Sequence, residues 1–179
     1  MLCFPTLLPF LHGRLLFSLP QFMYNKAHPC FRQDERRRKK DTMSRMTVEE
    51  LLQTPYWIID ILPCQVPADS PGQYFDAAAY WRKEPQRTAI KQRQIDLILK
   101  LNCYRSISLD EGKTLNPSPD RIAEAIRKEW TGILLDDALI TSDPEDHNMT
   151  LYNPDEQLLM LVRTLAAGEG FYVWRSENE

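Results

Sequence analysis

Acidic residues and a histidine gather between positions 136 and 147, where the sequence has its densest polar cluster. The members of this cluster are Asp136, Asp137, Asp143, Glu145, Asp146 and His147. Carboxylates beside an imidazole can bind a divalent cation or act as general acid and base. The spacing lacks the glycine and the terminal glutamate of a calcium loop, and Asp also forms turns by bonding its own backbone. Asp137 and His147 are therefore candidate catalytic residues, while a solvated turn is the favoured interpretation of His147.

Asp60 is the third candidate catalytic residue. It lies in the run from Tyr56 to Leu62, whose β-branched and aromatic side chains predict a buried strand. A carboxylate in such a strand is costly unless it is exposed on one face or paired. We therefore expect Asp60 either on a partly open face or beside an Arg or Lys, with a functional carboxylate as the less favoured interpretation.

Aromatic and basic side chains are interleaved in the one basic patch of the acidic body that follows residues 1–42. The candidate binding surface consists of Tyr74, Phe75, Tyr80, Trp81, Arg82, Arg87 and Lys91. This mixture is typical of surfaces that stack bases or form the hot spot of a protein interface. The competing interpretation places the aromatic rings in the core and the charges on a solvated helix face.

The sequence contains no G-x-G-x-x-G, P-loop or G-x-S-x-G motif. The cysteines at positions 3, 30, 64 and 103 have no metal-ligand spacing, and His147 is the only histidine after Met43. We therefore expect no cofactor, no metal and reduced thiols, with Cys103 buried at the start of a strand. These observations favour a binding module over an enzyme.

Helical and strand patterns interleave along residues 47–174. Helices are expected after a capping box at Thr47–Glu50, over 73–83 and 85–101, from 116–120 to about Trp130 with Gly132 as the stop, and from Asn153 to about 167. Strands are expected at 56–62, 103–109, 138–141, 149–152 and 171–174, with a hairpin-type connection over 142–148.

We predict an α+β fold, a single small domain with a mixed sheet of about five strands and three to four helices packed on it. A doubly wound α/β fold is the alternative.

The first 42 residues differ from the rest of the chain. They carry eight Lys or Arg against three acidic residues, whereas the remainder carries 14 basic and 22 acidic residues. Prolines and Gly13-Arg14 interrupt their apolar run, so neither a secretory signal nor a transmembrane helix is predicted. The basic run before Met43 resembles a purine-rich ribosome-binding stretch translated in frame. We hypothesise that translation starts at Met43 or Met46, so that 43–179 forms the globular domain. A disordered basic arm is the alternative. Codons other than AGG or AGA at Arg36 to Arg38 would contradict the late start.

Four phrases resemble an uncharacterised small-protein family of gut clostridia. They are PYWIIDILP at 55–63, SPGQYF at 70–75, LKLNCY at 99–104 and MTLYNPD at 149–155. The likeness spans about residues 46–174 and leaves residues 1–42 uncovered. Because that family has no assigned activity, the resemblance implies a bacterial cytosolic protein and transfers no functional residue.

The acidic body is a poor match for nucleic acid, whose binding depends on Lys and Arg contacts to phosphates. We expect a soluble cytoplasmic binding or regulatory module without a membrane or nucleic-acid partner. Its expected partner is another protein or a second copy, held by the aromatic and basic surface. The alternative is a small metal-assisted hydrolase built on Asp60 or on the 136–147 cluster, which requires Asp60, Asp137 and His147 to converge.

Overall fold

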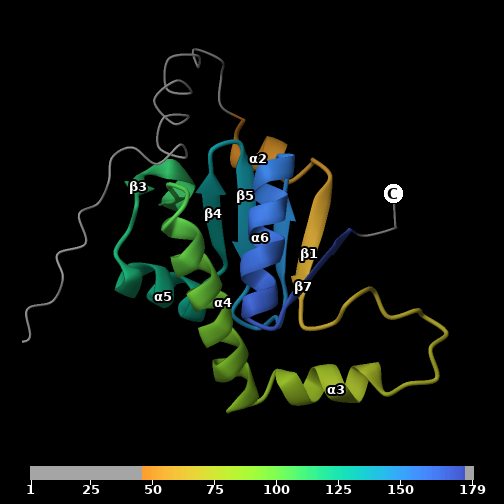
Figure 1. Cartoon of the computed structure of the whole chain (residues 1–179). Coiled ribbons are helices and arrows are strands. Elements are labelled where there is room, and N and C mark those ends of the chain that lie inside the picture. The colour runs from red at the N-terminus through yellow and green to blue at the C-terminus, as the bar shows by residue number, and fades with distance from the viewer. Residues whose placement is uncertain (1–45, 176–179) are drawn as a thin grey trace, which may run out of the picture. The chain divides into compact units, whose positions relative to one another are not determined.

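The computed structural model describes residues 46–175, in which seven strands form one antiparallel sheet (Figure 1). The strands are β1 (Tyr56–Asp60), β2 (Ser108–Leu109), β3 (Thr114–Leu115), β4 (Thr131–Leu135), β5 (Ala138–Ser142), β6 (Met149–Tyr152) and β7 (Tyr172–Arg175). Their order across the sheet is β3-β2-β4-β5-β6-β1-β7, and all six pairings are antiparallel. The α+β class is therefore confirmed. The expected mixed sheet of about five strands is wrong in strand number and direction, and the doubly wound alternative, which needs parallel strands, is excluded.

Helices cover both faces of the central strands. The helices are α2 (Val48–Leu51), α3 (Tyr74–Trp81), α4 (Gln86–Asn102), α5 (Pro119–Lys128) and α6 (Glu156–Gly168), and η1 (Asp110–Gly112) is a short 3-10 turn. In Figure 1, α4 and α6 lie across one face of the sheet, whereas α3 projects beyond its end beside the start of α4. Side chains alternate along β5, so that Ile140 joins the main core while Leu139 packs with Leu51 of α2. This double cover explains why β5 is buried along its whole length.

The capping box predicted at Thr47 is present. The Glu50 amide donates to the Thr47 hydroxyl at 3.2 Å, and the Thr47 amide donates to the Glu50 carboxylate at 2.8 Å. The hairpin over 142–148 is also confirmed, because Ser142 pairs with Met149 across β5 and β6. The last helix begins later than expected: Asp155 accepts from the Leu158 amide and is the cap, while Asn153 adopts a left-handed conformation.

One strand expectation and one helix-stop expectation are wrong. Residues 103–107 do not form a strand, because α4 continues to Asn102 and Cys103 caps it with an exposed thiol. Gly132 does not stop a helix, because it lies inside β4 and pairs with Thr141. A Cβ atom at Gly132 would meet the Leu139 Cδ1 atom at 3.3 Å, so the glycine serves close packing of β4 on β5. The expectations for residues 1–42 and for a start at Met43 lie outside the described residues.

Candidate functional site

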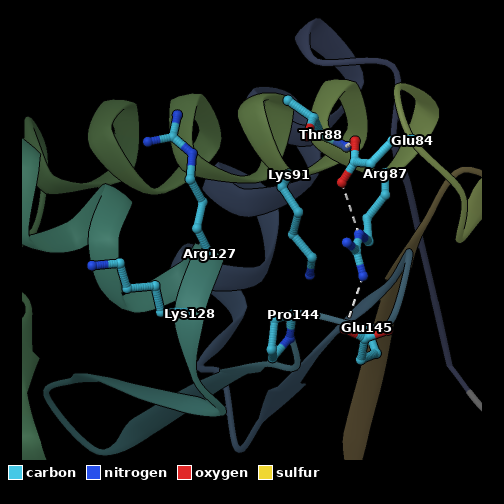
Figure 2. Close-up of a pocket in the computed structure, with 8 residues that line it drawn as sticks. All are labelled: Glu84, Arg87, Thr88, Lys91, Arg127, Lys128, Pro144 and Glu145. Carbon is cyan, nitrogen blue, oxygen red and sulfur yellow. Dashed lines mark hydrogen bonds and ion pairs between the residues drawn. The ribbon is translucent and has the colours of Figure 1, made fainter.

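A pocket of about 230 Å³ opens between the first half of α4, the end of α5 and the loop that joins β5 to β6 (Figure 2). Its lining consists of Glu84, Arg87, Thr88, Lys91, Arg127, Lys128, Pro144 and Glu145. Four of these side chains are basic and two are acidic, which leaves an excess of two positive charges. We call this site the Lys91 pocket, because Lys91 extends from α4 toward Pro144 at its base.

Lys91 is buried, with only 4% of the residue exposed, and its hydrogen bonds go to neutral oxygens. Its Nζ atom donates to the Gln94 side-chain oxygen at 2.8 Å, to the Asp143 carbonyl at 2.5 Å and to the Ser142 hydroxyl at 3.4 Å. Within residues 46–175 it forms no ion pair with a carboxylate. Burial lowers the pKa of Lys91 to about 8, although the negative charges of the 143–146 carboxylates partly oppose this shift. Lys91 is therefore a desolvated cation whose charge is not matched by a contacting anion.

Gln94 fixes the loop that forms one wall of the pocket. It is completely buried, and its side-chain amide donates to the carbonyls of His147 at 3.1 Å and Asn148 at 3.3 Å. Its oxygen also accepts from the Ser142 hydroxyl at 3.3 Å. One turn of α4, Lys91 to Gln94, thus holds both ends of the β5–β6 loop through side-chain hydrogen bonds.

The cations at the rim differ in how strongly they are already engaged. Arg87 donates to Glu84 at 3.0 Å and to Glu145 at 2.8 Å, and the two bonds lie on either side of its guanidinium in Figure 2. Lys128 pairs with Glu124 on the same helix at 2.8 Å. In contrast, Arg127 donates to the neutral Gln92 side chain at 2.5 Å and has no acidic partner in the described part of the chain. Arg127 is therefore the rim cation most available to an incoming anion.

A second polar pair lies behind the pocket, where β1 ends. The Nε2 atom of His147 lies 3.7 Å from the Oδ1 atom of Asp60, and only 4% and 5% of these residues are exposed. Burial raises the pKa of Asp60. The electrostatic interaction with His147 and the hydrogen bonds from the backbone N–H groups of residues 61 and 62 act in the opposite direction and lower that pKa. Neither ring nitrogen of His147 has a hydrogen-bond partner. The Trp81 ring covers the imidazole at a centroid distance of 5.5 Å.

The structure brings together two of the three candidate catalytic residues. Asp60 and His147 converge, but Asp137 lies in the β4–β5 turn, at the opposite end of β5 from His147. The cluster at 136–147 is therefore divided by a whole strand, with Asp136 and Asp137 at one end and the remaining members at the other. No group of three or more His, Cys, Asp and Glu side chains within residues 46–175 is arranged to hold a metal ion.

The expected environments of Asp60 and His147 are both wrong. Asp60 is neither on an open face nor beside an Arg or Lys, because its neighbour is an imidazole that follows β5. His147 is not a solvated turn residue, because the loop folds inward under Trp81. A turn sequence specifies a change of chain direction, and it does not specify which of its side chains the neighbouring helix covers.

The candidate binding surface is divided between solvent and core. Phe75, Tyr80 and Arg82 are exposed, with Phe75 at 86%, and the remaining members are Tyr74, Trp81 and Arg87, which are partly buried, and Lys91, which is buried. Arg82 contacts Asp146 at 3.5 Å, which ties the end of α3 to the β5–β6 loop. The set is therefore neither one continuous exposed surface nor a clean division into aromatic core and solvated charges.

Seven residues that line or support the site were not predicted as site residues: Glu84, Thr88, Gln94, Arg127, Lys128, Ser142 and Pro144. Gln94 carried a usable signal, because it follows Ile90 by four residues and precedes Leu97 by three, which places an amide within an apolar helical stripe. Arg127 and Lys128 carried none, because two cations in a last helical turn are ordinary.

No family model, curated protein or solved structure matches this chain. Among residues 46–175, no helix has the length and apolar character needed to cross a membrane.

Proposed function

We propose that this domain is a binding module that holds a phosphate-type dianion in the Lys91 pocket. The observation that supports this proposal is the buried Lys91 ammonium, which lines an open pocket without a contacting carboxylate. The three N–H groups of Lys91 already donate to protein oxygens, so Lys91 acts on an anion through its charge, or by exchanging its long 3.4 Å bond to Ser142. The interaction of the charges is strong because little water competes at a buried position. Arg127, which also has no acidic partner among the described residues, supplies a planar donor group at the rim.

The charge and size of the pocket favour a small dianion. A phosphate monoester carries a charge of about −1.5 to −2 at pH 7, which matches the excess of two positive charges in the lining. A volume of about 230 Å³ is below the range of roughly 300–1,000 Å³ that drug-sized ligands occupy. The Lys91 pocket therefore fits the anionic end of a ligand, or a small anion by itself.

Binding explains the lining better than catalysis does. The two carboxylates of the pocket, Glu84 and Glu145, both accept hydrogen bonds from Arg87, so their negative charges are already paired with a cation. The remaining polar groups, apart from the Thr88 hydroxyl, are cations that donate hydrogen bonds. Such a set stabilises a resting negative charge.

Isothermal titration calorimetry of the full chain with inorganic phosphate tests the proposal. We expect Arg127→Gln to weaken binding roughly tenfold, because a hydrogen bond to a charged group contributes about 1.5–3 kcal/mol. Lys113→Gln is the matched control, because it removes one charge from an exposed lysine outside the pocket. If phosphate does not bind at millimolar concentration, or if both variants weaken it equally, the Lys91 pocket is not the anion site.

We also propose that the protein works in the bacterial cytoplasm. Its described cysteines, Cys64 and Cys103, are free and exposed, which suits a reducing compartment.

A contact between two copies through α3 is the second candidate function. It is favoured by the exposure of Phe75 and Tyr80, two large aromatic side chains on one short helix. Sedimentation velocity at increasing protein concentration tests it, with the Phe75→Ser variant as comparison. A self-association that the variant abolishes supports this candidate, and a monomer at 100 μM removes it.

A further inference from the structure

Two depressions of the surface share a wall. The Lys91 pocket is lined by Arg87 and Glu145, and the same two residues line a narrower void with Trp81, Ile90, Asp146 and His147. The hydrogen-bonded ion pair between Arg87 and Glu145, at 2.8 Å, is therefore the partition between the anion pocket and His147. Both partners are partly exposed, at 33% and 70% of their side chains, so the pair is easily separated.

His147 has two unused hydrogen-bonding atoms behind this partition. Both ring nitrogens are buried and without a partner. The void is too narrow in this conformation to admit a water molecule, so solvent does not supply the missing partner. Buried polar atoms without partners are rare, and they call for an explanation such as a ligand contact.

We infer that His147 is a second recognition residue of the Lys91 pocket, for a phosphate monoester whose organic group is aromatic. This inference rests on the proposed function of the pocket. The phosphate takes the Arg87 guanidinium from Glu145, the partition opens, and the organic group enters beside His147. No bond of the ligand is broken in this event.

The composition of the void determines the class of organic group. The Trp81 ring and the Ile90 side chain are apolar and suit the face of an aromatic ring. The imidazole can supply one hydrogen bond to the organic group, and its Nε2 atom lies 3.7 Å from the Asp60 carboxylate. The charged groups facing His147 are Asp60 from β1, Asp146 and Glu145 from its own loop and Arg87 from α4. Three carboxylates around this position disfavour a second anion, so only one end of the ligand is negative.

Chemical labelling tests the partition without any ligand. Diethylpyrocarbonate modifies accessible imidazoles, and peptide mapping by mass spectrometry measures the modification at His147 in the full chain. We expect Glu145→Gln to increase the labelling rate of His147 at least roughly fivefold, because the variant weakens the contact with Arg87. Glu124→Gln is the matched control, since Glu124 pairs with Lys128 and does not line either depression. Equal labelling rates in the wild type and in Glu145→Gln overturn the inference.

Ligand binding tests the second subsite. Phenyl phosphate is expected to bind roughly tenfold more tightly than inorganic phosphate, because an aromatic stacking contact contributes about that factor. His147→Gln and Trp81→Leu should each remove this advantage and leave the affinity for inorganic phosphate unchanged. Failure of inorganic phosphate to bind overturns the proposed function. Binding of inorganic phosphate without any preference for phenyl phosphate overturns only the role of His147.

Discussion

The imidazole of His147 and the carboxylate of Asp60 lie 3.7 Å apart in the interior, although one follows β5 and the other ends β1. Because burial raises the pKa of Asp60, the folded state holds the carboxyl proton more tightly than the unfolded chain does. The contribution of Asp60 to the free energy of unfolding is thus fully present below the unfolded pKa near 3.8, and it is lost as the pH rises through the folded value.

The Asp60→Asn variant tests this direction. The amide has nearly the same shape and no charge, so we expect the variant to gain stability relative to the wild type as the pH rises from 4 to 7. Urea denaturation at each pH measures the difference. Asp69→Asn, an exposed loop position, serves as control and should show a constant difference. A difference that also stays constant for Asp60→Asn would contradict the raised pKa.

Phosphate affinity should decrease above pH 8. Burial lowers the pKa of Lys91 to about 8, so at pH 9.5 the free protein holds mostly neutral Lys91 and must take up a proton to bind the anion. We expect roughly a tenfold loss of affinity between pH 7 and pH 9.5, measured by calorimetry. Lys91→Met should bind weakly and lack most of this dependence, while Arg127→Gln should bind weakly and keep it. Circular dichroism verifies that both variants are folded.

Gln94→Leu should be strongly destabilising. The leucine removes the acceptor of the Ser142 hydroxyl and the donor to the carbonyls of His147 and Asn148, and it removes one acceptor from Lys91. We expect the free energy of unfolding to fall by about 2–4 kcal/mol. Gln92→Leu on the exposed side of the same helix should change it by less than about 0.5 kcal/mol. Similar values for the two variants would show that the amide does not hold the loop.

The capping box makes a separate contribution to stability. Thr47→Ala removes the hydroxyl that accepts from the Glu50 amide, and we expect a loss of about 1 kcal/mol in thermal or urea unfolding. Thr47→Ser keeps the hydroxyl and should restore most of this loss. Loss of the cap also weakens packing on the sheet, because α2 places Leu51 against Leu134 of β4 and Leu139 of β5.

The sequence was most informative where a feature depends on neighbouring residues. The Thr47 box, the hairpin between β5 and β6 and the start of α5 near Pro119 all follow from local hydrogen bonding and backbone restriction, and each was predictable. Strand β4 was missed, because Gly132 after a helical pattern is equally compatible with a helix stop. The choice depends on Leu139, which packs closely against the glycine from the next strand.

The site was less predictable because its contacts are distant in the chain. Nothing near Asp60 indicates that an imidazole lies beside it, and nothing near Lys91 indicates that the Asp143 carbonyl accepts a hydrogen bond from its ammonium. The sequence placed Lys91 either in a binding surface or on a solvated helix face, and neither interpretation predicts a buried ammonium. Its burial follows from the inward path of the β5–β6 loop, which depends on tertiary packing.

The position of β1 in the sheet has a consequence for how the chain folds during synthesis. Both of its neighbours, β6 and β7, come from the last part of the described chain, with Tyr56 beside Tyr152 and Trp57 beside Arg175. During translation β1 leaves the ribosome long before β6 and β7 are synthesised. Its apolar side chains therefore remain exposed to solvent until these strands can pair with it. This domain is therefore expected to complete its folding only after β7 has left the ribosome, and nascent chains halted before β7 should be protease-sensitive and candidates for chaperone binding.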